Sequence, residues 1–157
     1  MLSSIRPRVL CVDDDEDSRD MLSTLLGFSR IETKAVATAA QALSLIQAER
    51  FDLYLLDAWL PDLDGFELCR RMRAFDPDTP ILFFSGAAYA ADKKRGIDAG
   101  ANAYVIKPDL AGLLGSIKQF VSLAESVTTH TQVIPAEREV NISLPFNFET
   151  TRALYVS

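Results

Sequence analysis

The segment Val9-Leu10-Cys11-Val12-Asp13-Asp14-Asp15 places three carboxylates directly after four apolar residues. A short apolar run bounded by polar residues is typical of a buried β-strand. Three later apolar runs stop in the same way, at Asp57, Ser85 and Lys107, and a further run covers 31–36. The sequence therefore predicts five strands, at residues 9–12, 31–36, 51–56, 80–84 and 103–106.

Segments with apolar residues at helical spacing separate these strands and follow the last one. Thr38 and Asp64 are suitable N-caps for the second and third helices, and Asp109 caps the last, expected over 110–124. The first helix should end at Gly27. Strands that are apolar on both faces need helices on both sides. The alternation thus predicts an α/β fold with a doubly wound, five-stranded parallel sheet.

The residues that end the strands carry the chemistry, because ligands of doubly wound sheets bind beyond the carboxyl ends of the strands. The winding brings the acids after residue 12 to one rim with Asp57, Ser85 and Lys107. Two carboxylates ~4 Å apart repel by about 4 kcal/mol at an effective dielectric near 20, so a positive group must offset them. Lys107 is one candidate and a divalent cation is the other. Oxygen ligands without a histidine cluster favour Mg²⁺.

The composition fits a folded domain better than a nucleic-acid-binding or membrane protein. The 157 residues are 48% hydrophobic and 24% charged, with a net charge of −6, whereas nucleic-acid binders usually carry a basic face. No apolar run approaches the ~20 residues of a membrane span, and residues 1–8 lack the apolar core of a secretory signal. Cys11 and Cys69 are expected to be reduced, buried thiols. We therefore expect a cytoplasmic protein that contacts neither nucleic acid nor membrane.

These features together resemble the receiver domain of two-component response regulators. The resemblance covers about residues 8–125, and it rests on short pieces that are specific in their order and spacing: Val9-Leu10-Cys11-Val12-Asp13-Asp14, Asp52-Leu53-Tyr54-Leu55-Leu56-Asp57, Leu60-Pro61-Asp62-Leu63-Asp64-Gly65, Ser85, and Gly100-Ala101-Asn102-Ala103-Tyr104-Val105-Ile106-Lys107-Pro108. It implies a flavodoxin-like sheet in the order 2-1-3-4-5. It also implies a signalling domain that takes a phosphoryl group from a histidine kinase or phosphotransfer protein, rather than an enzyme with a separate substrate.

The resemblance assigns Asp57 as the phosphoacceptor and places Mg²⁺ beside it. Asp14 would bind the ion directly and Asp13 would help through a water molecule. Asp57 and the backbone carbonyl of Trp59 would complete the protein ligands. A carboxylate attacks phosphorus only where the surrounding negative charge is neutralised, and Mg²⁺ and Lys107 would meet that need.

Ser85, Lys107 and Tyr104 would respond to the phosphoryl group. Lys107 would pair with its oxygens, Ser85 would donate a hydrogen bond and move inward, and Tyr104 would fill the space as a rotamer switch. Serine lacks the methyl group of the threonine that is also usual in the family, which would loosen this coupling. Trp59 and Ala87 would flank the path of the attacking water, so their sizes suggest an altered phosphoaspartate lifetime.

Two other functions compete with this interpretation. The segment Asp62-Leu63-Asp64-Gly65 looks like the nucleophile motif of haloacid-dehalogenase-type phosphatases. That motif should directly follow the first strand, whereas here it lies in a loop five residues after Asp57, where a helix-capping turn is an adequate explanation. The other is a receiver-like interaction module that is never phosphorylated. A calcium loop from Asp13 is rejected, because its sixth and twelfth positions hold Ser18 and Thr24 instead of Gly and Glu. His130 is alone and is expected to be an ordinary residue.

Residues 126–157 form a predicted C-terminal extension to a receiver domain at 1–125. Apolar side chains occupy every second position over 140–148, which is typical of a strand with one apolar face, and Pro145 restricts it to an edge or hairpin. Residues 131–134 and 153–156 are further candidate strands. We expect this face to dock on the receiver or on a second chain. A homodimer would form through it or through the fourth and fifth helices, and output would pass to a separate, unidentified downstream protein.

Overall fold

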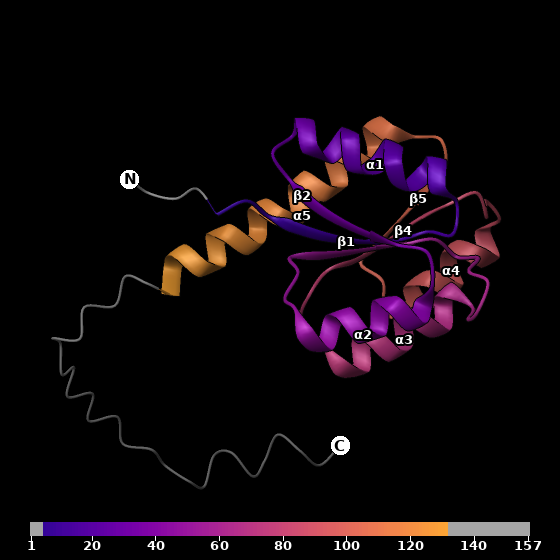
Figure 1. Ribbon diagram of the computed structural model, residues 1–157. Helices are drawn as coiled ribbons and strands as arrows, with labels where there is room; N and C mark the ends of the chain where they lie inside the picture. The colour runs from indigo at the N-terminus through magenta and orange to yellow at the C-terminus, as the bar shows by residue number, and fades with distance from the viewer. Residues whose placement is uncertain (1–4, 132–157) are drawn as a thin grey trace, which may run out of the picture.

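A five-stranded parallel sheet lies between two layers of helices in the computed structural model, which describes residues 5–131 (Figure 1). The strand order β2-β1-β3-β4-β5 confirms the predicted doubly wound fold. Helices α1 and α5 cover one face of the sheet, and α2, α3 and α4 cover the other (Figure 1). The elements in chain order are β1 (Arg8–Val12), α1 (Glu16–Phe28), β2 (Glu32–Val36), α2 (Ala39–Ala48), β3 (Leu53–Leu56), α3 (Gly65–Phe75), β4 (Ile81–Ser85), α4 (Ala90–Asp98), β5 (Ala103–Ile106) and α5 (Leu110–Thr131).

The central strands are apolar throughout because each of their faces meets a layer of helices. All four residues of β3 are buried. Side chains alternate between the faces, so Leu53 and Leu55 pack toward α1 and α5, whereas Tyr54 and Leu56 pack toward α2 and α3. Full burial of one such side chain contributes about 1.5–3 kcal/mol to the free energy of folding, so β3 is held firmly and fixes the position of the residue that follows it. The cysteines are buried and free, as predicted.

Three side-chain caps hold the helix starts as the sequence predicts. Thr38 and Asp64 each accept a hydrogen bond from a backbone N–H in the first turn of α2 and α3. The Asp109 carboxylate accepts one from the N–H of Gly112 at the start of α5. Each cap satisfies a donor that the helix itself leaves unpaired, which stabilises the helix by about 1 kcal/mol.

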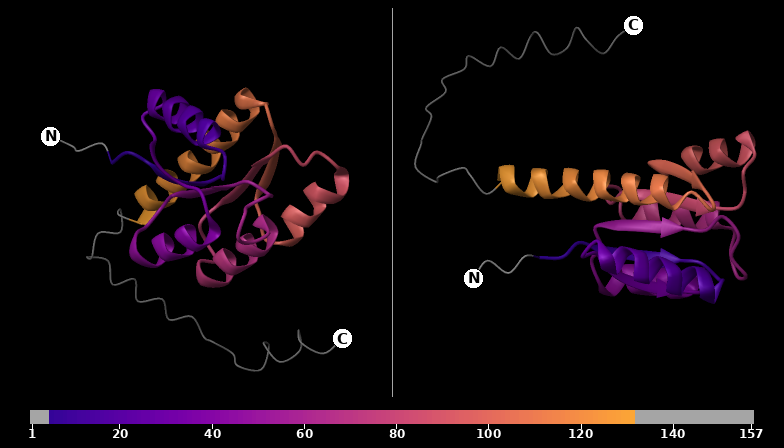
Figure 2. Two further views of the ribbon diagram at one scale, coloured as in Figure 1. Left: turned by 45° about the vertical axis from the view of Figure 1, so that its right-hand side comes forward. Right: turned by 90° about the horizontal axis from the view of Figure 1, so that it is seen from above.

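Two helix ends differ from the prediction. Gly27 lies inside α1, which ends at Phe28, because burial of Leu22 and Leu26 outweighs the ~1 kcal/mol that a glycine costs in a helix. Helix α5 continues to Thr131, so no strand starts there. In Figure 2 it projects past the end of the sheet where the strands begin. The predicted strands over 140–148 and 153–156, and the rest of 132–157, lie outside the described residues.

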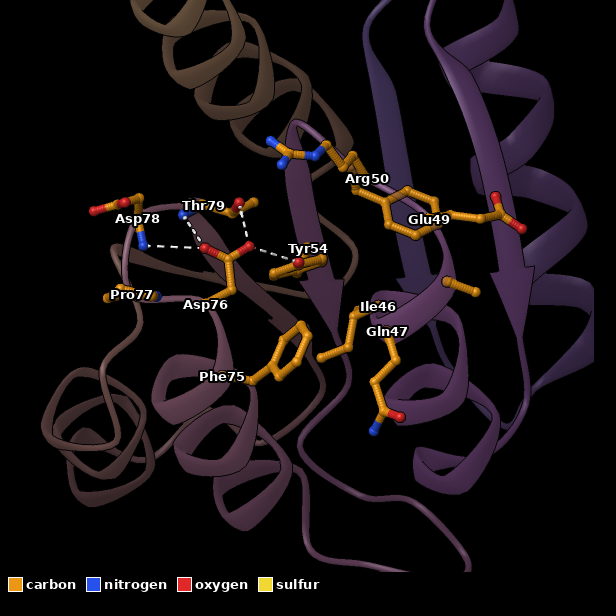
Figure 3. Close-up of a pocket in the computed structure, with 12 residues that line it drawn as sticks. Ile46, Gln47, Glu49, Arg50, Tyr54, Phe75, Asp76, Pro77, Asp78 and Thr79 are labelled. Carbon is orange, nitrogen blue, oxygen red and sulfur yellow. Dashed lines mark hydrogen bonds between the residues drawn. The ribbon is translucent and has the colours of Figure 1, made fainter.

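A cavity of about 510 Å³ opens where β3 and β4 begin, opposite the end that carries the acids (Figure 3). One of its lining residues is Asp76, which accepts hydrogen bonds from the hydroxyls of Tyr54 and Thr79 at 2.8 and 2.6 Å. Burial raises the pKa of Asp76, but these hydrogen bonds outweigh it and lower the pKa to about 2. The carboxylate thus fastens the α3–β4 turn. Within 5–131, no helix is both long and apolar enough to cross a membrane.

Candidate phosphorylation site

Four parallel strands bring the predicted site residues to one rim of the sheet. Asp13 follows β1, Asp57 follows β3, Ser85 ends β4 and Lys107 follows β5. The backbone ladder continues into these residues, since the N–H of Asp57 donates to the carbonyl of Val12 at 2.9 Å and that of Lys107 to the carbonyl of Ser85 at 3.0 Å. The rigid sheet therefore fixes the positions from which all four side chains project.

Lys107 joins the two buried carboxylates of the rim. Its Nζ lies 2.8 Å from Asp13 Oδ2 and 3.1 Å from Asp57 Oδ2. Burial lowers the pKa of Lys107, but the hydrogen bond to Asp13 and the negative charges of both acids outweigh it and leave the pKa above its usual value. The lysine therefore stays protonated, and it is the expected cation between the acids.

Ser85 and Trp59 hold the other oxygen of Asp57. The fully buried hydroxyl of Ser85 donates to Asp57 Oδ1 at 2.8 Å, and the backbone N–H of Trp59 donates to the same oxygen at 3.3 Å. Asp57 itself is only 9% exposed. Both of its oxygens are thus oriented by donors, which leaves a carboxylate at the rim with little freedom to rotate.

The acids Asp13, Asp14 and Asp57 form a group that fits a hard cation. One oxygen from each lies within 4.8 Å of the others, with Asp14 exposed and the other two buried. At 4.8 Å and an effective dielectric near 20, one pair of charges repels by about 3.5 kcal/mol. Three carboxylates with one lysine leave net negative charge here. An all-oxygen set with one or two direct carboxylates is what Mg²⁺ takes in proteins.

Ser18 and Arg19, at the start of α1, support the acidic loop, and the sequence did not point to them. Ser18 Oγ donates to Asp13 Oδ2 at 2.8 Å, and the guanidinium of Arg19 donates to the backbone carbonyls of Asp13 and Asp14. The N–H of Asp15 donates to the other oxygen of Asp13. No spacing rule identifies such partners, because they depend on how the helix leaves the loop.

Tyr104 is connected to the site through Ala87. The Tyr104 hydroxyl donates to the carbonyl of Ala87 at 2.8 Å, and the N–H of Ala87 donates to Ser85 Oγ at 3.3 Å. The Tyr104 ring stacks on Phe83 with centroids 5.4 Å apart. A Cβ added at Gly96 would lie 2.8 Å from the ring, so the glycine makes room for it. The predicted switch residue therefore faces inward, two hydrogen bonds from Ser85.

Trp59 and Ala87, the two residues expected to flank the path of the attacking water, line one cavity. The Trp59 side chain is 56% exposed, whereas Ala87 is buried. Their effect on phosphoaspartate lifetime stays a prediction, as does the use of the Trp59 carbonyl as a metal ligand.

The alternative phosphatase motif serves a structural role. The Asp62 carboxylate accepts hydrogen bonds from the N–H groups of Ala39 and Ala40, so it caps α2 from the β3–α3 loop. The hydrogen bond from Ala40 is the main reason that the pKa of Asp62 is lowered. Asp64 caps α3 and pairs with Arg95 at 3.1 Å. Neither acid belongs to the cluster at the rim, so the helix-capping interpretation is favoured.

Comparisons with known proteins identify the family of this chain. The family model of the response regulator receiver domain matches residues 9–118. Response regulator MprA of Mycolicibacterium vanbaalenii is 38% identical over 101 residues, which are 64% of this chain and 44% of that protein. MprA of Mycobacterium bovis strain BCG is 33% identical over 144 residues, or 85% of this chain and 63% of that protein. The chain thus spans 44% to 63% of the length of these curated relatives.

Solved structures show the same architecture. A CheY-like response regulator receiver domain protein from Methanospirillum hungatei has a TM-score of 0.73 at 33% identity, over 78% of this chain and 98% of that one. The BeF3-activated DrrB receiver domain has a TM-score of 0.70 at 28% identity, over 75% of this chain and 99% of that one. The structure is therefore that of a doubly wound α/β domain with a cluster of acidic residues at the carboxyl ends of its strands. The chain belongs to the response regulator receiver domain family of two-component signal transduction.

Proposed function

We propose that Asp57 accepts a phosphoryl group and that the domain signals in the phosphorylated state. The observation that carries the proposal is that both oxygens of this buried carboxylate are held by donors, Ser85 and Trp59 on one side and Lys107 on the other. The same donors lie close enough to stabilise the negative oxygens of a phosphoryl group when an oxygen of Asp57 attacks phosphorus.

The proposed transfer forms a bond between an Asp57 oxygen and phosphorus while the bond from phosphorus to the donor breaks. With a phosphohistidine donor, the electron pair of the broken P–N bond returns to the imidazole. Lys107 neutralises charge on the phosphoryl oxygens throughout. Asp13, Asp14, Asp57 and the Trp59 carbonyl would hold Mg²⁺, which would neutralise phosphoryl charge and favour in-line transfer.

The phosphorylated state would act through the chain of contacts from Ser85 to Tyr104. In the described arrangement the Ser85 hydroxyl donates to Asp57, and after transfer it can donate to a phosphoryl oxygen instead. Ala87 makes hydrogen bonds with both Ser85 and Tyr104, so movement of the Ser85 hydroxyl would change the position of the Tyr104 side chain. Two packings of Tyr104 would then exchange population on phosphorylation. Trp59 and Ala87 would set how readily water reaches the phosphoaspartate.

The proposal extends to partners and location. A histidine kinase or phosphotransfer protein would supply the phosphoryl group, and a separate downstream protein would receive the signal. The domain would be a phosphoacceptor and not an enzyme with its own substrate. Free, buried cysteines support a reducing compartment such as the cytoplasm. The division into a receiver at 1–125 and an extension at 126–157, and a homodimer through the extension or the α4–α5 face, stay predictions.

Phosphorylation by a small donor tests the proposal directly. Purified protein is mixed with Mg²⁺ and acetyl phosphate, and the acid-labile phosphate is mapped by mass spectrometry. We expect one adduct, on Asp57, which disappears in Asp57→Asn and in the presence of EDTA. The matched control is Asp62→Asn, which removes the competing carboxylate and should leave the adduct in place.

The three candidate functions give different results in this experiment. An adduct on Asp62 would support the phosphatase interpretation and contradict the proposal. No adduct with acetyl phosphate, phosphoramidate or a phosphorylated histidine kinase would leave the unphosphorylated interaction module as the better description.

A further inference from the structure

A notch near the proposed phosphorylation site is lined by aromatic and acidic side chains to which the proposed function gives no binding role. It is a cavity of about 450 Å³, lined by Trp59, Tyr89 and Asp92 around a floor of small residues at 86–88. Trp59 is 56% and Tyr89 81% exposed, which is unusual for large aromatic side chains on a domain surface. We propose that this notch binds the guanidinium of an arginine side chain from a protein partner that docks over Asp57.

Charge selects a cation as the occupant. Asp92 is the charged residue of the notch, and no basic side chain lines it. The Asp92 side chain makes no hydrogen bond or ion pair with the residues of the described part of the chain, although it is only partly exposed. The faces of tryptophan and tyrosine rings carry negative electrostatic potential. A carboxylate and two aromatic rings around one cavity therefore attract a cation more than a neutral or acidic group.

The same domain already shows this chemistry with an arginine. The Arg95 guanidinium lies 4.2 Å from the centroid of the Phe66 ring and bonds the Asp64 carboxylate at 3.1 Å. A planar guanidinium can stack on a ring and donate to a carboxylate at once, whereas the ammonium of lysine cannot stack. The notch presents the same pair of groups, with a second ring and without an internal arginine. This favours arginine over lysine as the ligand.

The floor of the notch connects it to the switch, and this part of the inference rests on the proposed function. Ala87 lies in the floor, donates to Ser85 Oγ and accepts from the Tyr104 hydroxyl. An occupant of the notch would hold residues 86–88 in the arrangement where Ser85 faces Asp57. Because Ser85 leaves this arrangement when it donates to a phosphoryl oxygen, binding and phosphorylation would then weaken each other by the same factor, since coupling between two sites is reciprocal.

The binding step can be measured without phosphorylation, because Trp59 is the single tryptophan of the chain. The full chain is titrated with N-acetylarginine amide at constant ionic strength while Trp59 fluorescence is recorded. The matched probes are N-acetylcitrulline amide, which has the same shape without the charge, and N-acetyllysine amide. The test variant is Asp92→Asn, and the control is Asp98→Asn, since Asp98 lies on the same helix but pairs with Lys94.

We expect a saturable fluorescence change with the arginine probe and about fivefold weaker binding of the citrulline and lysine probes. Asp92→Asn should reduce the arginine affinity to that of citrulline, and Asp98→Asn should leave it unchanged. The proposal that the notch binds a guanidinium would be overturned by any of three results: no saturable fluorescence change, equal affinity for the citrulline and arginine probes, or an equal loss of arginine affinity in both variants. Equal binding of lysine would overturn the assignment of arginine.

The coupling to the switch is a separate arm of the experiment. We expect beryllofluoride with Mg²⁺, a mimic of the phosphoryl group, to weaken arginine binding by about threefold through differential affinity for two states. If beryllofluoride does not change the affinity, the proposed coupling is overturned, while the proposal that the notch binds arginine stands. Asp57→Asn should still bind the arginine probe without beryllofluoride, so failure of the proposed function is distinguishable from failure of the notch.

Discussion

Replacing Lys107 with methionine removes the ammonium that contacts both Asp13 and Asp57, at 2.8 and 3.1 Å. Methionine is of similar length and neutral, so the change removes charge with little change of shape. The acids of the rim lie within 4.8 Å of one another, and two unit charges at that distance repel by about 3.5 kcal/mol at an effective dielectric near 20. Removing one partner from a buried ion pair typically costs about 3–5 kcal/mol, which agrees. We therefore expect Lys107→Met to lose about 3 kcal/mol of unfolding free energy.

Thermal and urea unfolding at pH 7 in EDTA measure this loss, which corresponds to a fall in Tm of about 10 °C. Mg²⁺ should raise the Tm of Lys107→Met more than that of the wild type, because the variant site is more negative. The control is Lys93→Met, an exposed lysine of α4, which should change little. A variant as stable as the wild type in EDTA, or one indifferent to Mg²⁺, would refute the electrostatic argument.

Three further predictions concern the supports of the site and the far end of the sheet. Gly65→Ala would place a Cβ 2.2 Å from the carbonyl oxygen of Asp57, so we expect a loss of about 1–3 kcal/mol in calorimetry and displaced Asp57 signals by NMR. Gly96→Ala would place a Cβ 2.8 Å from the Tyr104 ring and displace the ring from its inward position. The NMR chemical shifts of the ring should therefore change, and unchanged shifts would contradict that packing. Burial raises the pKa of Asp76, but hydrogen bonds outweigh it and lower it from 3.8 to about 2. The stability that this carboxylate contributes is thus present at neutral pH and is lost as the pH falls from about 4 through 2. In acid unfolding followed by circular dichroism, Asp76→Asn should therefore lose less free energy of unfolding over that pH range than the wild type.

Local patterns predicted the elements well because burial and capping leave traces in the sequence itself. The apolar run before Asp57 predicted β3, and Thr38 and Asp64 predicted the caps that the structure contains. Gly27 misled the prediction of α1, because helix propensity is weak compared with the packing of an amphipathic face. The length of α5 was underestimated for a different reason, because its apolar periodicity fades before Thr131 while the helix continues.

The sequence by itself determined the order of strands and helices and the identity of the residues that end each strand. Those features follow from period and polarity, which act between residues close together in the chain. The tertiary structure alone decided the partners: Ser18 supports Asp13, Asp62 caps α2 and not its own helix, and Ala87 joins Ser85 to Tyr104. The contacts of Asp62 with α2 and of Ala87 with Tyr104 depend on how elements distant in the chain pack together. The contacts of Ser18 with Asp13 and of Ala87 with Ser85 are local, but they too depend on the path of the loop, because a hydrogen bond depends on positions to within tenths of an ångström.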